Sequence, residues 1–266
     1  MNGLGLGIAA TLLVAATPSP SPALETLLAA PPSGFVELTT APLRGHFTAD
    51  DYASNAEASK QASVAAAMNH DGFLEGYSNT WVSRTSQHVL VEAVLAFTGG
   101  RGARDWMTAV EAADKKDPQY LHADTITGID PYYGEHVADP AGNVYGDALT
   151  FVKGNDVFVV GVVSTKDDAL NEAVTQTRAQ YDRAPKESIP SGQWPENAES
   201  GHSVFYLLGT LIPPVLILAV IAGLIGVVVG RRRRAAVAPP AVQHSPDGKY
   251  WWDGQSWRPV EPPPPS

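Results

Sequence analysis

Hydrophobic positions between residues 34 and 186 switch between a two-residue and a 3.6-residue period, which predicts strands and helices mixed in one domain. Residues 35–38 alternate briefly, as in a short strand. Residues 73–82 and 88–97 are the next two predicted strands, and the second is an almost unbroken apolar run. Such a run predicts a central strand that is covered on both faces.

A β-hairpin is the clearest local pattern. Two β-rich runs, residues 149–153 and 156–160, are joined by Gly154 and Asn155, a pair that favours a two-residue turn. In that register Lys153 faces Asp156, so we expect opposite charges beside the turn.

Three helices are predicted from the 3.6-residue spacing. The first covers residues 49–69 and begins at Thr48, whose spacing to Asp51 matches a capping box. The third is expected to start at Ser164 or Thr165 and to end near residue 184. The expected buried positions of the second and third helices are Ala103, Trp106, Met107 and Val110, and Leu170, Ala173, Val174, Thr177 and Tyr181.

The predicted element order is β-α-β-β-α-β-hairpin-α, with strand pairs joined too closely for parallel crossovers. We therefore expect an α+β fold, a largely antiparallel sheet covered by helices. This order resembles the PsbP-like fold, whose members include small exported bacterial lipoproteins and photosystem-associated proteins. The resemblance implies fold only, and members of that fold are mostly non-enzymatic binding or assembly factors.

A long uncharged run predicts a membrane span at residues 204–230. A helix of that length rises about 40 Å, against a hydrocarbon core of roughly 30 Å. It is followed by Arg231, Arg232, Arg233 and Arg234, which indicate the cytoplasmic side. We therefore expect a single-pass membrane protein with its N-terminal domain outside and its C-terminal tail in the cytoplasm.

Small residues recur every four positions in this span, at Ala222, Gly226 and Gly230. Such a ladder allows close approach of two helices and predicts a homodimer through the span. The alternative is chance, because small residues are abundant in such segments.

Residues 1–23 have the pattern of a secretory signal peptide, with a short apolar run at residues 4–16 and cleavage after Ala16 or Ala23. An uncleaved signal anchor is the alternative. Residues 24–33 are expected to be a linker, residues 34–186 the extracytoplasmic domain, and residues 187–203 a stalk rich in Ser, Pro, Gly, Asn and Glu.

The tail after the arginines comprises a basic and Ala/Pro-rich linker at residues 231–244, a Trp-rich segment at 245–260 and a Pro-rich end at 261–266. Its Tyr-Trp-Trp-Asp-Gly sequence at residues 250–254 resembles a short module of unknown function in actinobacterial-type membrane proteins. A turn at Asp253 and Gly254 would pair Tyr250 with Trp257. We expect Tyr250, Trp251, Trp252 and Trp257 to bind a protein partner or the membrane surface.

Charge and cysteine content exclude several classes of function. Residues 24–203 carry 25 acidic and 12 basic residues, a net charge of −13, so a nucleic-acid partner is not expected. Cysteine is absent, which excludes disulfides and thiolate chemistry. No cofactor is expected.

The region of residues 114–139 holds six acidic residues together with histidines and tyrosines. Carboxylate and imidazole groups are metal ligands, so the region could bind one ion. The candidate ligands are His122, Asp124, Glu135, His136 and Asp139. The favoured interpretation is a solvated acidic loop without metal, because no complete metal-binding motif occurs.

No complete catalytic constellation is present: Gly76, Tyr77 and Ser78 come nearest to a nucleophile motif and lack its second glycine. We therefore expect a non-enzymatic binding or sensing domain outside the cytoplasm. The alternatives are a membrane-tethered, metal-assisted enzyme and a structural envelope protein.

Overall fold

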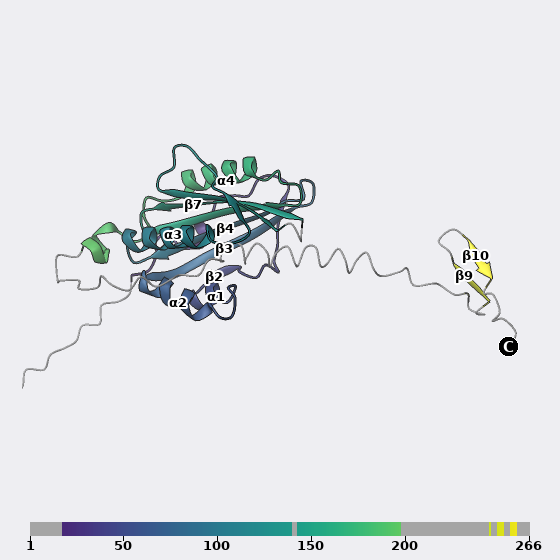
Figure 1. The fold of residues 1–266 in the computed structure, drawn as a ribbon, viewed down its shortest axis with the longest axis horizontal. Helices are drawn as coiled ribbons and strands as arrows, with labels where there is room; N and C mark the ends of the chain where they lie inside the picture. Colours follow the sequence, from purple (N-terminus) through teal and green to yellow (C-terminus); the bar gives the residue numbers. More distant parts are fainter. Residues whose placement is uncertain (1–17, 140–142, 198–244, 246–248, 253–255, 260–266) are drawn as a thin grey trace, which may run out of the picture. The chain divides into compact units, whose positions relative to one another are not determined.

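The computed structural model describes residues 18–139, 143–197, 245, 249–252 and 256–259. The chain divides after Ile221 into two units. The described part of the first unit is one sheet with helices on both faces (Figure 1). Its strands are β1 (Phe35–Glu37), β2 (Gly45–Phe47), β3 (Phe73–Ser83), β4 (Val89–Phe97), β5 (Tyr120–His122), β6 (Tyr132–Asp139), β7 (Val144–Lys153) and β8 (Asp156–Ser164). Its α-helices are α1 (Ala49–Ala53), α2 (Gln61–His70), α3 (Gly100–Asp114) and α4 (Leu170–Arg183).

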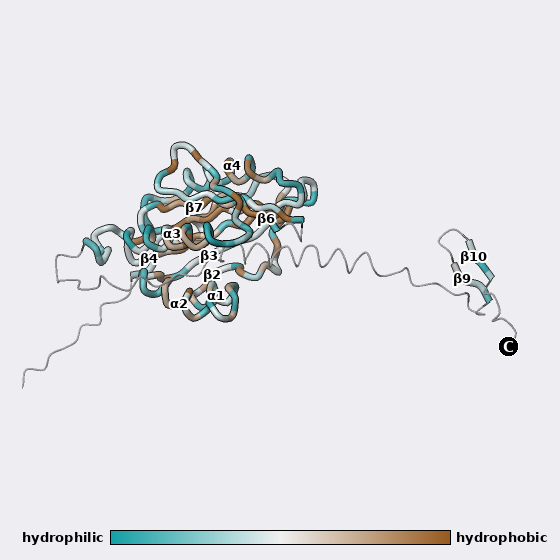
Figure 2. Tube along the Cα trace, viewed as in Figure 1, coloured by the Kyte–Doolittle hydropathy of each residue, from teal (hydrophilic) through white to brown (hydrophobic). Residues whose placement is uncertain are grey.

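The strand order in the sheet is β1-β3-β4-β8-β7-β6-β5, with β2 also pairing with β3. The described strand pairs are antiparallel. Two hairpins, β3–β4 and β7–β8, meet at the central β4–β8 pair. Every residue of β4 is buried, as the apolar run predicts. Figure 2 shows hydrophobic residues along the strands.

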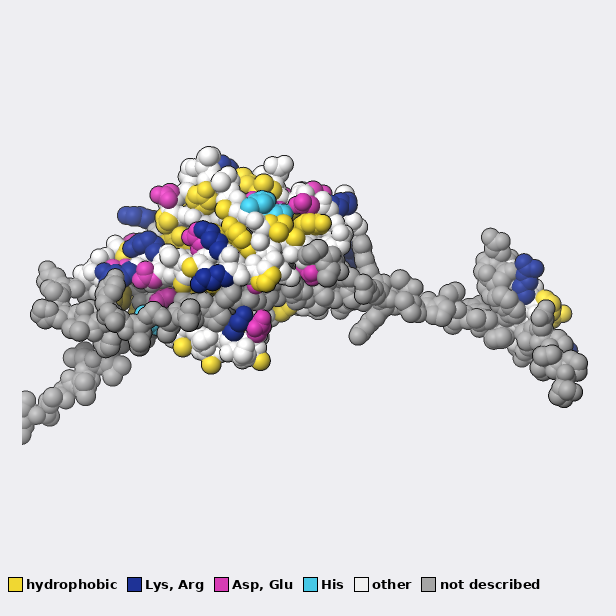
Figure 3. Space-filling view, viewed as in Figure 1, with side chains coloured by type: hydrophobic (Ala, Val, Ile, Leu, Met, Phe, Trp, Pro, Cys, Tyr) yellow, Lys and Arg dark blue, Asp and Glu magenta, His cyan; other side chains and the backbone are white. Residues whose placement is uncertain are grey.

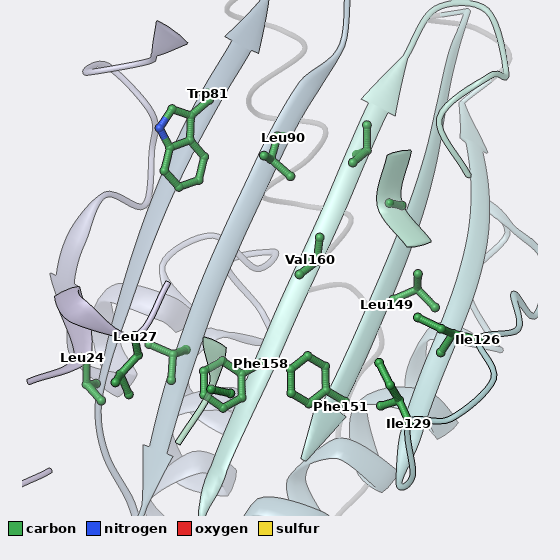
Figure 4. Close-up of a cluster of buried hydrophobic side chains, with 14 of the residues drawn as sticks. Leu24, Leu27, Trp81, Leu90, Ile126, Ile129, Leu149, Phe151, Phe158 and Val160 are labelled. Atoms are coloured by element: carbon green, nitrogen blue, oxygen red, sulfur yellow. The ribbon is translucent and has the colours of Figure 1, made fainter. Parts of the chain in front are cut away.

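The two faces of the sheet are covered by different helices. On one face, which we call the α4 face, alternate residues of the central strands pack with Ala173 of α4. Leu90, Val160, Phe158 and Phe151 line this core (Figure 4). On the other, the α3 face, Phe97 packs against Trp106 of α3 at a ring distance of 6.5 Å. The alternation of strand side chains assigns each residue to one face.

Residues 24–33, expected to be a linker, instead form part of the α4-face core. Leu24 is 0% exposed and Leu27 is 4% exposed, and the short helix η1 (Leu24–Thr26) carries the first of them. Gln180 of α4 holds this segment by accepting a hydrogen bond from Ala29 N at 2.7 Å and donating to Leu27 O at 3.0 Å. The prediction of a linker is wrong because these leucines fill the space beside α4.

The predicted helices are present with different bounds. Residues 49–69 form α1 and α2 rather than one helix, and the capping box of Thr48 and Asp51 is confirmed. The four predicted positions of α3 are buried. In α4, Leu170 is 40% exposed and the N-cap is Ala169, so the expected start at Ser164 or Thr165 is wrong.

The predicted β7–β8 hairpin is confirmed in its register, since Lys153 pairs with Asp156 and Phe151 with Phe158. The expected charge pair is not formed. Lys153 Nζ donates instead to the carbonyl oxygens of Tyr181 and Ala184, both at 2.8 Å. The lysine thus caps the C-terminal end of α4, where free carbonyls favour a positive charge.

The first part of the predicted stalk, residues 187–203, packs on the domain. Ser188 and Ile189 are 0% exposed, and Ser188 Oγ donates to Asp156 Oδ1 at 2.6 Å. Two short helices, η2 (Ser191–Gln193) and η3 (Pro195–Asn197), follow. Glu196 accepts a hydrogen bond from Arg101 N at the start of α3 at 2.7 Å. Residues 187–197 therefore belong to the folded domain.

The predicted fold class is wrong. The structure has an eight-stranded sheet and four α-helices in its described part, and β2, β5 and β6 are missing from the predicted PsbP-like order. The fold class also included one transmembrane helix. None of the helices in the described ranges combines the length and the apolar content needed to cross a membrane, and residues 204–230 lie outside those ranges.

The second unit contains a two-stranded antiparallel sheet, β9 (Tyr250–Trp252) and β10 (Trp257–Pro259). Trp252 pairs with Trp257, and Tyr250 pairs with Pro259. The expected pairing of Tyr250 with Trp257 through a two-residue turn is therefore wrong. Four residues, 253–256, connect the strands, so the register moves by two positions.

Candidate functional site

The region of residues 114–139, interpreted from sequence as a solvated loop, forms the edge of the sheet. Strand β5 pairs with β6, and β6 pairs with β7 over its whole length. Six of the eight residues of β6 are buried. Hydrophobic periodicity does not reveal this strand, because the polar residues Glu135 and His136 occupy buried positions on opposite faces.

Two chain contacts bring three ligand-type side chains together on the α4 face. In the β6–β7 register His136 lies opposite Asp147. The segment after β5 returns across β6, where Asp124 N donates to Gly134 O at 3.1 Å. A Cβ on Gly134 would lie 2.5 Å from Asp124 O, so a glycine is needed for this close approach. Asp124 is thereby placed beside the His136–Asp147 pair.

Asp124, His136 and Asp147 form the cluster that we call the edge triad. One ligand atom from each residue lies within 4.8 Å of the others. The residues are 5%, 6% and 2% exposed, respectively. His136 Nδ1 lies 2.7 Å from Asp147 Oδ1, and Asp124 Oδ2 has no hydrogen-bond partner among the described residues. An acceptor buried in this way is costly unless a cation or proton meets it.

The electrostatics of the edge triad show the same need for positive charge. Burial, and then the negative charge and hydrogen bond of Asp147, raise the pKa of Asp124 to about 6 against the opposing effect of His122 and His136. Two carboxylates that share a buried site resist joint ionisation. A proton or a metal cation between them removes the repulsion.

Two exposed groups border the triad on different sides of the His136 ring. His122 stacks on His136 with ring centroids 4.6 Å apart and an interplanar angle of 13°, and its Nδ1 lies 3.5 Å from Asp124 Oδ1. Asp167 Oδ1 lies 3.5 Å from His136 Nε2. Figure 3 shows histidine side chains at the surface of the domain with acidic side chains close by. The buried triad is therefore flanked by two exposed polar side chains, His122 and Asp167.

The other sequence candidates do not join the triad. Glu135 points to the α3 face, where its Oε2 accepts a hydrogen bond from Tyr133 at 2.8 Å. Burial, and then the charge of Asp114, raise the pKa of Glu135 to about 8. Asp139 ends β6 on that same face by strand alternation. Of the five candidates, the structure brings Asp124 and His136 together and places His122 beside them.

Asp147 and Asp167 were missed in the sequence. A signal for Asp147 exists, because it occupies a position that alternates with Leu149 and Phe151 and therefore faces inward in β7. An acid at an inward strand position needs a buried partner. Asp167 follows β8 in a loop with φ 56°, and no sequence pattern marks it.

The remaining predicted site residues lie in or near the second unit. Ala222, Gly226, Gly230, Arg231, Arg232, Arg233 and Arg234 fall outside the described residues. Tyr250 and Trp257 are 44% and 49% exposed, while the side chains of Trp251 and Trp252 are not described. Partner binding by these four aromatic residues stays a prediction.

Comparisons with known proteins leave the family open. No family model matches the chain, and no curated protein matches its sequence. Among solved structures, the extracellular domain of PknH from Mycobacterium tuberculosis is similar with a TM-score of 0.40 and 14% sequence identity. The match covers 60% of this chain and 93% of that domain. A similarity this low carries no argument about function.

Proposed function

We propose that the folded domain is a non-enzymatic binding domain that acts outside the cytoplasm and holds a divalent cation in the edge triad. The observation that carries the proposal is the convergence of Asp124, His136 and Asp147 around a buried carboxylate oxygen without a partner. Carboxylate oxygens and an imidazole nitrogen are ligands that divalent metals use in proteins. The ion would neutralise two acids that otherwise repel each other.

Binding is favoured over catalysis by the surroundings of His136. Both ring nitrogens face carboxylates, Asp147 at 2.7 Å and Asp167 at 3.5 Å. Such a ring is held in place and is not turned toward a hydroxyl nucleophile. The arrangement therefore does not favour a histidine-activated hydroxyl nucleophile.

Action outside the cytoplasm is supported by the N-terminal sequence. Residues 4–16 form a short apolar run followed by small residues and prolines, a pattern typical of secretory signals. Fractionation of cells that express the full chain, with protease added to intact cells, tests this part. Protection of the whole domain from protease would contradict it.

The binding proposal is tested by calorimetric titration of the full-length chain with Zn²⁺ and Ca²⁺. We expect one ion per chain and a loss of affinity of about 100-fold or more in Asp147→Asn, because the variant removes a ligand charge. Glu172→Gln is the matched control, since Glu172 also meets a buried histidine, His88. Absence of binding, or equal binding by wild type and Asp147→Asn, would refute the proposal.

A further inference from the structure

We infer that the edge triad selects a zinc-type transition ion and that His122 turns inward to supply the fourth ligand. The inference rests on the proposed function, because it names the ion class and the missing ligand of the same site. Three observations support it: the donor set of the triad, the position of His122 and the placement of Asp167.

The donor set already separates the ion classes. The edge triad offers one imidazole and two carboxylates. Calcium takes six to eight oxygen ligands, and magnesium prefers an octahedron of oxygens. Zinc is stable with four ligands drawn from His, Asp and Glu. Three converging protein ligands that include a nitrogen are therefore one short of a closed zinc site and far short of a calcium site.

His122 is the residue in position to complete that set. It lies opposite His136 in the β5–β6 pairing, so the register holds the two rings together. Its Nδ1 lies 3.5 Å from Asp124 Oδ1, a carboxylate of the edge triad. Ligand atoms around a tetrahedral zinc ion with bonds of 2.0–2.1 Å are about 3.3 Å apart, so this spacing is close to the required one.

The stacked arrangement must change when the ion binds. A metal ion lies in the plane of each imidazole that binds it, and two parallel rings 4.6 Å apart have no common in-plane point between them. The His136 side chain is 7% exposed and is held by buried Asp147, whereas the His122 side chain is 62% exposed and has room to turn. Binding should therefore turn the His122 ring and end the stacking.

Asp167 is the competing candidate for the fourth ligand, and the geometry argues against it. Its carboxylate faces His136 Nε2, while Asp147 faces Nδ1. One ion cannot bind both edges of the same ring. With the ion at Nδ1, the Nε2–H is free to donate to Asp167, which is the usual partner of a metal-bound histidine. Asp167 then orients the ring without touching the ion.

The test compares wild type with His122→Ala by titration of the full-length chain with Zn²⁺, Co²⁺, Mg²⁺ and Ca²⁺. We expect wild type to bind Zn²⁺ at least about 100-fold more tightly than Mg²⁺ or Ca²⁺. His122→Ala should lower Zn²⁺ affinity by about 10-fold or more. The matched control is His70→Ala, which removes a histidine that is 78% exposed and also lies beside an aspartate.

Two further measurements test directly whether His122 binds the ion. Absorption of bound Co²⁺ should report a tetrahedral site in wild type and an altered one in His122→Ala. In NMR spectra, Zn²⁺ should shift the ring signals of His122 and His136 and leave those of His70 unchanged. Unchanged His122 signals, or equal Zn²⁺ affinity of His122→Ala and wild type, would overturn the role of His122.

The results also distinguish this inference from the proposed function. Zn²⁺ binding that is lost in Asp147→Asn but insensitive to His122→Ala supports the site and refutes the fourth ligand. Tighter binding of Ca²⁺ than of Zn²⁺ refutes the ion class alone. No binding of any tested ion by wild type refutes both.

Discussion

His136 and His88 have closely similar surroundings, yet only His136 belongs to the candidate site. Each side chain is 7% exposed, and each ring lies between two carboxylates. His88 meets Glu172 through Nδ1 and Asp168 through Nε2. The difference is a third acid. Asp124 joins His136 with a buried oxygen that has no partner, and no comparable group of three is found elsewhere in the described ranges.

The comparison teaches that a buried histidine between acids is not itself a sign of function. At His88 each carboxylate takes one ring nitrogen, and the pairs tie the start of β4 to the first turn of α4. The two pairs of His88 therefore have a structural role. At His136 one buried carboxylate oxygen remains without a hydrogen-bond partner among the described residues. Such an unpartnered acceptor indicates a bound ligand. Five variants test this distinction in four experiments.

His88→Ala should have the largest effect on stability and none on metal binding. Removing the ring leaves Glu172 and Asp168 without their shared partner, so we expect the free energy of unfolding to fall by about 3 kcal/mol. Urea denaturation measures the change, and Zn²⁺ titration of the same variant is the control. A fall in Zn²⁺ affinity would show that the two histidines are not separate.

Asp124→Asn should remove the response of stability to metal. An ion at 100 times its dissociation constant stabilises the wild type by about 2.7 kcal/mol, and the variant should lose this gain. Without metal the variant should be as stable as wild type or more so, because a buried carboxylate is replaced by a neutral amide. Unfolding with and without Zn²⁺ measures both. A marked loss of stability in the absence of metal would mean that Asp124 is structural.

Glu92→Gln tests whether an unpartnered buried carboxylate oxygen outside the edge triad contributes to Zn²⁺ binding. Glu92 is 0% exposed, receives a hydrogen bond from Gln176 at 2.7 Å, and its Oε2 has no partner among the described residues. Burial raises its pKa from 4.5 to about 7. The unfolded chain loses this proton first, so the stability that protonated Glu92 contributes is fully present below pH 4.5 and is lost as the pH rises to about 7.

Glutamine mimics the protonated acid, so Glu92→Gln should remove that part of the decline. We expect the stability of the variant relative to wild type to be about 3 kcal/mol greater at pH 8 than at pH 4. Urea denaturation across this range provides the measurement. Asp156, whose pKa burial also raises to about 7, still contributes a pH dependence of the same sign in the variant. An unchanged pH profile, or a change in Zn²⁺ affinity, would contradict the assignment.

Asp167→Asn and Asp168→Asn form the most finely matched pair, because adjacent residues face different histidines. Asp167→Asn should weaken Zn²⁺ binding about tenfold, or about 1.4 kcal/mol, since a neutral amide holds the Nε2–H of His136 less strongly. Asp168→Asn should leave Zn²⁺ affinity unchanged. Calorimetry on both variants gives the comparison, and equal effects would remove the distinction between the two histidines.

Much of the sheet could be predicted from the sequence, but its edge could not. Strands β3 and β4 and the β7–β8 hairpin have continuous or alternating apolar residues, and helix α3 has a regular stripe. These patterns are local. Strand β6 was not predicted because its buried positions include the polar residues Glu135 and His136. His136 is paired with Asp147 of β7 and stacks on His122 of β5, whereas Glu135 accepts a hydrogen bond from Tyr133 within β6.

The candidate site was partly visible for the same reason. His122, Asp124 and His136 lie within 15 residues of one another, so the sequence indicates that they could share an ion. Asp147 belongs to the next strand, and only the register of β6 with β7 brings it opposite His136. The sequence therefore indicates which residues here could bind an ion, and the strand pairing determines which of them come together.

The sequence by itself determined the β7–β8 turn, the central apolar strand β4, the buried stripe of α3 and the strongly acidic charge of residues 24–203. Only the tertiary structure decided that residues 24–30 and 187–197 belong to the domain, that β6 is a strand and that Asp147 joins Asp124 and His136. Turn chemistry and periodicity act between near neighbours. The partners of a buried charge come from strand pairing, which joins residues that are far apart in the chain.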